Sequence, residues 1–227
     1  MSEGLAVKDF LKERRRMVEE QLKARGIGDE RVLEAMLAVP RHMFVEEALR
    51  SQAYNDFPLP IGEGQTISQP YSVALMTEAL QLQGEETVLE IGTGSGYQSA
   101  VLSRLAKQVL TVERFPRLAR KARMVFDACT YTNIMMRVGD GSVGWEEKAP
   151  FDAIMVTAGA PVVIESLKQQ LVPGGRLVMP VGSFRQQVLK RIVREGAARF
   201  HEENLGACHF VPLVGHYGWR ETPARSC

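Results

Sequence analysis

Two acidic residues flank a glycine-rich turn near the middle of the chain. Glu90 lies just before the turn Gly92–Gly96, which has glycine at every second position. Glu113 follows about twenty residues after the first of these glycines, where an acidic side chain can accept hydrogen bonds from ribose hydroxyl groups. Glycine lets the backbone turn sharply and approach a ligand with no side chain in between. This spacing indicates a site for a nucleotide or nucleoside.

The spacing of the glycines distinguishes between classes of such ligands. A dinucleotide fingerprint, G-x-G-x-x-G, would require glycine where this chain has Tyr97, and Glu90 would be an unfavourable neighbour for a pyrophosphate. An acidic residue before the turn instead suits a ligand with an ammonium or sulfonium centre, such as S-adenosyl-L-methionine. The alternative is a tight strand-to-helix turn that binds no ligand.

Small polar residues form a second group, upstream of this turn. The segment Ile61–Pro70 contains Thr66, Ser68 and Gln69, and Pro70 stands where it could begin a helix. From the residue types alone this segment is a flexible loop followed by a capped helix, in which Ser68 or Gln69 could be cap residues. Ser68 has no identifiable histidine and acidic partners, which argues against a covalent serine nucleophile.

Asp140 is a third candidate, because it lies between two glycines after the apolar run Ile134–Val138. Ligands of open α/β sheets bind outside the carboxyl ends of the strands, so Asp140 could accept a hydrogen bond from an adenine amine. The alternative is an ordinary turn aspartate.

Cys208, His209 and His216 match no spacing typical of a metal site, so we expect no metal.

Strands and helices in alternation must position these residues. Short apolar runs predict buried strands, and apolar residues at helical spacing predict the helices between them. The expected strands are Thr87–Ile91, Val109–Val112, Ile134–Val138, 150–156 and Arg176–Val181, and the expected helices are Tyr71–Leu82, Tyr97–Ala106, Arg117–Cys129 and Val162–Leu171. This order predicts an α/β fold with a doubly wound, mostly parallel sheet.

The two ends of the chain are expected to add other elements. An amphipathic helix over residues 5–25 begins with Leu5 on its apolar face, and a second helix, Glu30–Ala38, is capped by Asp29. After the core, antiparallel strands are expected over Gln186–Val193, Ala198–Glu202 and His209–Val214. We expect the tail from Arg220 onward to be loosely ordered.

Length and composition set further limits. The 227 residues suit a single domain, in which residues 1–83 would form an N-terminal helical cap and a loop, and residues 84–227 the core. A net charge of +1 offers no field that would attract nucleic acid. No apolar stretch follows the basic N-terminal residues, so we expect no signal peptide and no membrane span. Three cysteines without a C-x-x-C pair favour a reduced, cytoplasmic compartment. We also expect the protein to be a monomer.

Several of these segments together resemble one family. The sequences GEGQTISQPYSVALMTEAL and VLEIGTGSGYQSAVLSRL, followed in order by VGDG, LVPGGRLVMPVG and FVPLVG, are similar to those of the protein-L-isoaspartate O-methyltransferase family. The resemblance covers nearly the whole chain. TISQP is its family-specific element, whereas the other segments chiefly mark class I S-adenosylmethionine-dependent methyltransferases, which have a Rossmann-like fold.

The resemblance implies an activity and a set of site residues. The activity would be transfer of a methyl group from S-adenosyl-L-methionine to the free α-carboxyl of L-isoaspartyl residues in damaged proteins, which initiates repair through a succinimide and leaves S-adenosyl-L-homocysteine. Ser68 would be the catalytic residue, and Thr66, Ile67 and Ser68 would bind the substrate. With the glycine-rich turn, the expected cofactor-binding residues are Gln65, Thr66, Ser68, Glu90, Gly92, Thr93, Gly94, Gly96, Glu113, Asp140 and Gly141. Val73 is apolar where some members of the family carry a histidine.

Carboxyl methylation is consistent with the lack of an obvious general base. A carboxylate with a pKa of about 3.5 to 4 is already ionised at neutral pH, so no proton has to be removed. Two alternatives remain: a methyltransferase for small molecules or nucleic acid, and a binding module without turnover. An assay of methyl transfer to an isoaspartyl peptide, with the same peptide containing aspartate as the control, distinguishes these three functions.

Overall fold

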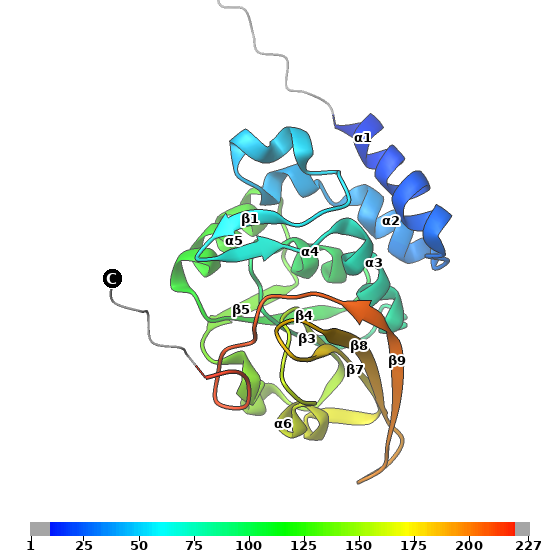
Figure 1. Cartoon of the computed structure of the whole chain (residues 1–227), viewed down its shortest axis with the longest axis vertical. Helices are drawn as coiled ribbons and strands as arrows, with labels where there is room; N and C mark the ends of the chain where they lie inside the picture. The colour runs from blue at the N-terminus through cyan, green and yellow to red at the C-terminus, as the bar shows by residue number, and fades with distance from the viewer. Residues whose placement is uncertain (1–9, 221–227) are drawn as a thin grey trace, which may run out of the picture.

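The computed structural model describes residues 10–220, and its centre is one seven-stranded sheet (Figure 1). In spatial order the strands are β5 (Ile134–Val138), β4 (Gln108–Glu113), β3 (Thr87–Ile91), β6 (Phe151–Val156), β7 (Leu171–Gly182), β8 (Gln187–Arg194) and β9 (Phe200–Cys208). The first five strands are parallel, and β8 and β9 continue the sheet in antiparallel pairing. The predicted mostly parallel, doubly wound sheet is confirmed.

The order of the strands creates a switch point between β3 and β6. From β3 the chain proceeds to β4 and β5 on one side, whereas β6 leads to β7 on the other side. Helices that follow neighbouring strands therefore diverge, which opens a crevice at the carboxyl ends of β3 and β6. The glycine-rich turn directly follows β3, so this topology places it at the crevice.

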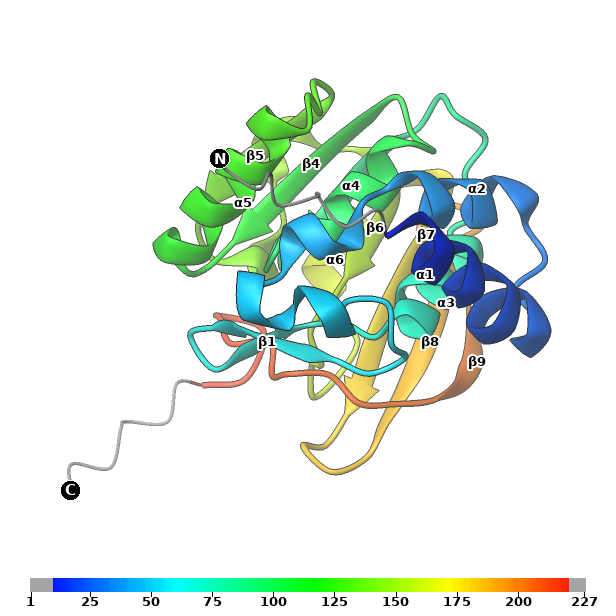
Figure 2. The ribbon, with the colours of Figure 1, turned by 90° about the horizontal axis from the view of Figure 1, so that it is seen from above.

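Two apolar layers enclose the sheet, because side chains alternate between its faces along each strand. Val88, Val109 and Met155 pack against the helices of one face, whereas Leu89 and Val156 pack on the other. The first face is covered by α2 (Glu30–Ala38), α3 (Pro70–Ala79), α4 (Tyr97–Ser103) and α5 (Pro116–Ala128). The second face is covered by α6 (Glu165–Gln169) and adjoining loops. Figure 2 shows α2, α3 and the N-terminal helix α1 (Leu11–Arg16) next to one another.

The N-terminal helix is more irregular than predicted. After α1 it continues as a π-helical segment, Met17–Leu22, and a 3₁₀ turn, Lys23–Arg25, and it ends at Gly26 with φ +95°. Leu5 and the rest of residues 1–9 lie outside the described part of the chain, as do residues 221–227 of the expected loose tail. The predicted cap of α2 is confirmed, since the Asp29 carboxylate accepts a hydrogen bond from the Arg31 N–H.

The segment before α3 is a β-hairpin, and its prediction as a flexible loop was wrong. β1 (Leu59–Gly62) pairs antiparallel with β2 (Gln65–Ile67). The two residues between the strands, Glu63 and Gly64, have φ values of +52° and +66°. Two consecutive left-handed residues are the geometry of a tight hairpin turn whose twist matches that of the strands. Pro70 begins α3, as predicted.

The C-terminal segment also differs from its prediction. β8 and β9 form the expected antiparallel pair, although β9 extends to Cys208, but His209–Val214 is not a strand. It makes only isolated bridges, among them Gly159 with Pro212, and Gly159 exchanges main-chain hydrogen bonds with Val211 and Leu213. The segment therefore crosses the carboxyl edge of the sheet and pairs with the loop after β6, a non-local contact that alternation in sequence does not indicate.

Residues 10–220 contain no helix that combines the length and apolar character needed to cross a membrane.

Gly96→Ala tests whether the turn before α4 requires glycine. Gly96 has φ +90°, and a Cβ there would lie 2.6 Å from Cε1 of the fully buried Phe126. We expect a loss of about 2–4 kcal/mol in the free energy of unfolding, because left-handed strain adds to overpacking. Gly84→Ala is the matched control, since Gly84 has φ +111° but no atom within 4 Å of its Cβ position, and it should lose about 1–2 kcal/mol. Urea unfolding measures both variants. If they lose the same free energy of unfolding, the contact with Phe126 adds nothing to the cost of a side chain at Gly96.

Candidate active site

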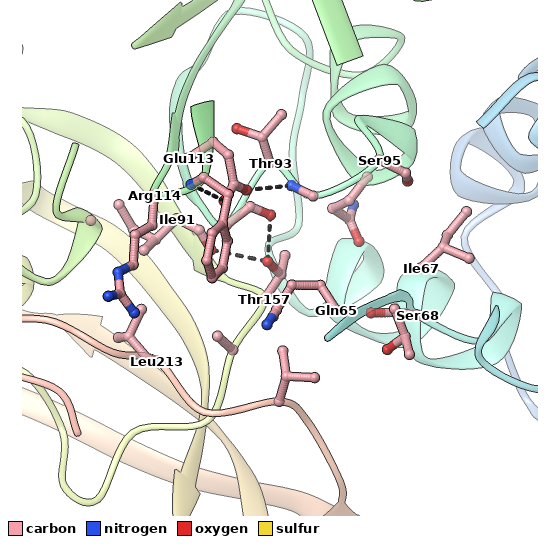
Figure 3. A pocket seen from close by; sticks show the side chains of 18 of the residues that line it. Gln65, Ile67, Ser68, Ile91, Thr93, Ser95, Glu113, Arg114, Thr157 and Leu213 are labelled. Atoms are coloured by element: carbon pink, nitrogen blue, oxygen red, sulfur yellow. Dashed lines mark hydrogen bonds between the residues drawn. The ribbon is translucent and has the colours of Figure 1, made fainter. Parts of the chain in front are cut away.

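A cavity opens at the switch point, bounded by the hairpin, the glycine-rich turn and the C-terminal segment (Figure 3). β2 supplies Gln65 and the segment after it supplies Ser68, whereas the end of β4 supplies Glu113. The predicted site residues that line this cavity are Gln65, Thr66, Ile67, Ser68, Gly92, Thr93, Gly94, Glu113 and Gly141. The fold thus brings together residues that are far apart in the sequence.

Glu113 lines the cavity with both of its carboxylate oxygens hydrogen-bonded. The residue is only 4% exposed. Its Oε2 accepts a hydrogen bond from the Gly94 N–H at 2.7 Å, and its Oε1 accepts one from the Phe115 N–H at 2.9 Å. A carboxylate has about four acceptor positions, so these two bonds leave about two for a ligand. A fixed carboxylate with one free position on each oxygen is suited to a pair of neighbouring hydroxyl groups.

The wall of the cavity at the glycine-rich turn consists of backbone. Gly92 has φ +99°, and a Cβ there would lie 2.4 Å from Oγ1 of Thr157. That hydroxyl donates to the carbonyl oxygens of Ile91 and Gly92, at 3.0 and 2.6 Å. Gly141 is equally restricted, because its Cβ would lie 2.4 Å from Cγ2 of Ile91. The site therefore excludes side chains at two of its predicted glycines.

Ser68 lies on the hairpin side of the cavity and is half-buried. Its carbonyl oxygen accepts a hydrogen bond of 2.7 Å from Nη2 of Arg41. Figure 3 draws no hydrogen bond from its hydroxyl to the other residues displayed. Ser68 therefore has a fixed main chain and a hydroxyl that can donate to a ligand.

Glu90 does not face this cavity, so the structure does not support the cofactor contact predicted for it. The side chain is 0% exposed and accepts hydrogen bonds from the hydroxyls of Ser99 and Thr111. Since side chains alternate along a strand, Glu90 points to the same face as Val88, beneath α4, rather than toward the edge where the strand ends. Burial raises the pKa of Glu90 to about 8, although the two hydroxyls lower it.

Gly96 and Asp140 also lie outside the lining. Gly96 packs against Phe126. Asp140 borders an adjacent shallow cavity, and its carboxylate accepts hydrogen bonds from Ser142 N, Ser142 Oγ and His216 N at 2.7–2.8 Å. Burial alone would raise the pKa of Asp140, but these bonds outweigh it and lower the pKa. The carboxylate thus anchors the C-terminal segment, and its contact with an adenine amine stays a prediction.

Several lining residues were not predicted. Thr157 follows β6, and the rule that ligands bind at the carboxyl ends of parallel strands could have indicated it. Phe115 could have been inferred from its closeness to Glu113. No signal in the sequence indicates Val211–Val214, which line the cavity only because the C-terminal segment crosses the sheet edge. Val73 is 2% exposed and adds an apolar wall.

Comparisons with known proteins agree with this architecture. A family model described as protein-L-isoaspartate(D-aspartate) O-methyltransferase matches residues 12–218. Proteins named protein-L-isoaspartate O-methyltransferase are similar in sequence: that of Syntrophotalea carbinolica is 59% identical over 94% of this chain and 98% of its own length, and that of Geobacter metallireducens is 60% identical over 91% and 95%.

Two solved structures are also similar. One, named protein-L-isoaspartate O-methyltransferase, has a TM-score of 0.81 and 30% identity, covering 90% of this chain and 67% of that chain. The other is a putative protein-L-isoaspartate O-methyltransferase from Plasmodium falciparum in complex with S-adenosyl-L-homocysteine. It has a TM-score of 0.76 and 27% identity, covering 88% of this chain and 98% of that chain.

Glu90→Gln tests the buried carboxyl through the pH dependence of stability. The pKa of Glu90 rises from 4.5 to about 8 on folding, so its stabilising contribution is complete below pH 4.5 and is lost as the pH rises through about 8. In that window we expect wild-type protein to lose stability relative to Glu90→Gln, by up to about 1.4 kcal/mol per pH unit. Urea unfolding of both proteins at several pH values measures this difference. Parallel curves would show that Glu90 is ionised in the folded protein.

Proposed function

Because this chain belongs to the protein-L-isoaspartate(D-aspartate) O-methyltransferase family, we propose how its cavity residues divide the work of that reaction. The enzyme transfers a methyl group from S-adenosylmethionine to the free α-carboxyl of L-isoaspartyl residues in damaged proteins, which initiates their repair through a succinimide. The observation that carries the proposal is that Ser68 and Glu113 line one cavity. One offers a hydroxyl donor and the other a buried carboxylate acceptor.

Glu113 is the proposed acceptor for the ribose hydroxyls of the methyl donor. Each of its oxygens already accepts one main-chain hydrogen bond, which leaves acceptor positions that fit a vicinal diol. The glycine backbone at Gly92 and the apolar side chains of Ile91 and Val112 line the same cavity and suit a nucleoside. The similar Plasmodium falciparum protein contains S-adenosyl-L-homocysteine, which supports this assignment.

Ser68 is proposed to hold the acceptor carboxylate. When bound, S-adenosylmethionine supplies a methyl group on a positively charged sulfur. The isoaspartyl carboxyl has a pKa of about 3.5 to 4 and is already ionised near neutral pH, so the protein needs no general base. The Ser68 hydroxyl can instead donate a charge-assisted hydrogen bond that fixes one carboxylate oxygen.

Alignment and exclusion of water are the contributions that this cavity can make. Holding two reactants in a reactive geometry is worth up to about 7–11 kcal/mol of the barrier. The hairpin β1–β2 and the segment Val211–Val214 line the cavity from different sides, so they can shield the reacting groups from water. We assign Gln65 and Thr66, which also line it, to the binding of cofactor and substrate.

We further propose that the enzyme acts in the cytoplasm and as a monomer. Cys129 and Cys208 are both free thiols, which suits a reducing compartment. The nearly balanced charge of the chain gives no reason to expect nucleic acid as a partner.

Ser68→Ala tests the role of the hydroxyl. We expect kcat/KM for an isoaspartyl peptide to fall about 10- to 150-fold, because a hydrogen bond to a charged group is worth about 1.5–3 kcal/mol. The affinity for S-adenosyl-L-homocysteine should change less than about twofold, since the hydroxyl is assigned to the substrate. Transfer of radiolabelled methyl and calorimetry measure the two quantities, with the aspartyl peptide as the unlabelled control. A large loss of affinity for S-adenosyl-L-homocysteine would show instead that Ser68 binds the cofactor.

Glu113→Gln tests the acceptor of the ribose. The amide keeps the shape of the side chain but loses the charge and one acceptor oxygen, so binding of S-adenosyl-L-homocysteine should weaken by about 1.5–3 kcal/mol. Glu63→Gln is the matched control, because Glu63 lies at the tip of the hairpin, pairs with the exposed Arg117 and does not line the cavity. Unchanged calorimetric affinity of Glu113→Gln would remove this residue from the site.

A further inference from the structure

Arg41 is a completely buried arginine whose guanidinium donates to main-chain carbonyl oxygens instead of a carboxylate. Its Nε donates to the carbonyl oxygen of Ala53 at 2.6 Å, and its Nη2 donates to that of Ser68 at 2.7 Å. The guanidinium carbon lies 4.7 Å from the centre of the Tyr97 ring, and Nη1 has no partner. Burial lowers the pKa of Arg41 to about 10, so the group stays charged near neutral pH.

The Ser68 peptide lies between two elements that are fixed by other contacts. On one side, Ile67 pairs with Leu59 in the hairpin. On the other side, the Tyr71 N–H donates to Oδ1 of Asp56, which holds the first turn of α3. Between these two anchors, the carbonyl oxygen of Ser68 is held by Arg41. The guanidinium thus fixes the short connection that carries the hydroxyl into the cavity.

Stability alone does not account for a charge at this place. A buried charge is costly to desolvate, and replacing buried ionic groups by well-packed apolar side chains is often neutral or stabilising. A guanidinium differs from an apolar side chain in one respect that matters here. It is a planar group whose donors point in fixed directions, so it can hold two carbonyl oxygens in one relative orientation.

We propose that Arg41 is a positioning residue for methyl transfer. Its guanidinium ties the carbonyl of Ser68 to that of Ala53 and so sets the direction of the Ser68 hydroxyl that aligns the substrate carboxylate. The inference rests on the role of Ser68 given above. A displacement of about 1 Å in a reacting group can lower a rate on the order of 100-fold, so a fixed main chain at Ser68 has a direct effect on turnover.

Arg41→Lys tests the geometry of the donors, because lysine keeps the charge but has no planar pair of donors. We expect kcat for an isoaspartyl peptide to fall about 10- to 100-fold, with less than about a twofold change in affinity for S-adenosyl-L-homocysteine. Arg41→Gln is the second variant. It removes the buried charge, which keeps the test possible if the lysine protein does not fold, and it should show the same pattern.

Arg14→Lys is the matched control. Nη1 of Arg14 also donates to main-chain carbonyls, those of Leu37 and Ala38 at 3.0 and 3.2 Å, but these lie at the end of α2 and not in the Ser68 segment. This variant should lower the melting temperature without changing kcat. If it lowers kcat as much as Arg41→Lys does, general loosening of the N-terminal helices explains the result and the inference is overturned.

A double-mutant cycle with Ser68→Ala separates positioning from a merely structural role. If Arg41 acts through the Ser68 hydroxyl, Arg41→Lys should lower kcat less than about threefold in the Ser68→Ala protein. Independent losses that multiply would overturn the inference about Arg41 and leave the role of Ser68 intact. Unchanged kcat of Ser68→Ala alone would overturn both. Wild-type turnover of Arg41→Lys would show that charge is sufficient and would also overturn the inference.

Discussion

The hydrogen bond between the Glu113 carboxylate and the Gly94 N–H joins the ends of two neighbouring strands. Glu113 ends β4, and Gly94 belongs to the turn that follows β3, so this 2.7 Å contact sets how far the turn extends over the edge of the sheet. A second bond, from the Phe115 N–H, fixes the other carboxylate oxygen. The carboxylate is therefore oriented by the protein itself, so the ribose contact proposed for it would cost little freedom on binding.

Glu90 and Glu113 illustrate how position on a strand decides what a carboxyl group can do. Both are almost fully buried and lie on adjacent parallel strands. Glu113 is the last residue of its strand, where the edge of the sheet meets the cavity. Glu90 pairs with Thr111, two residues before Glu113, so it lies deeper below this edge and bonds two hydroxyls in the core. Two residues along the sheet thus separate a carboxyl group in the core from one that lines the cavity.

The sequence predicted the parts of this structure that depend on local patterns. Apolar runs located β3, β5 and β6, and the glycine-rich turn with Glu113 located one side of the cavity. The cofactor contact of Glu90 stays a prediction that the lining of the cavity does not support, because closeness to the turn in sequence does not reveal how deep below the edge of the sheet a side chain lies. The hairpin β1–β2 was missed because Pro60, Gly62 and Gly64 are typical of loops. The buried contacts of Arg41 could not be inferred either, since they join residues that are 12 and 27 positions apart and leave no periodic pattern.

Segments from three widely separated parts of the chain line the cavity: the hairpin before α3, the turns after the central strands, and Val211–Val214. The last of these is held by main-chain hydrogen bonds between Gly159 and both Val211 and Leu213. During synthesis, β3 to β7 leave the ribosome before Val211–Val214 does, because they precede it in the chain. A nascent chain of that length has the glycine-rich turn and Glu113 but lacks one wall of the pocket. The pocket is therefore complete only after Val211–Val214 has reached the edge of the sheet.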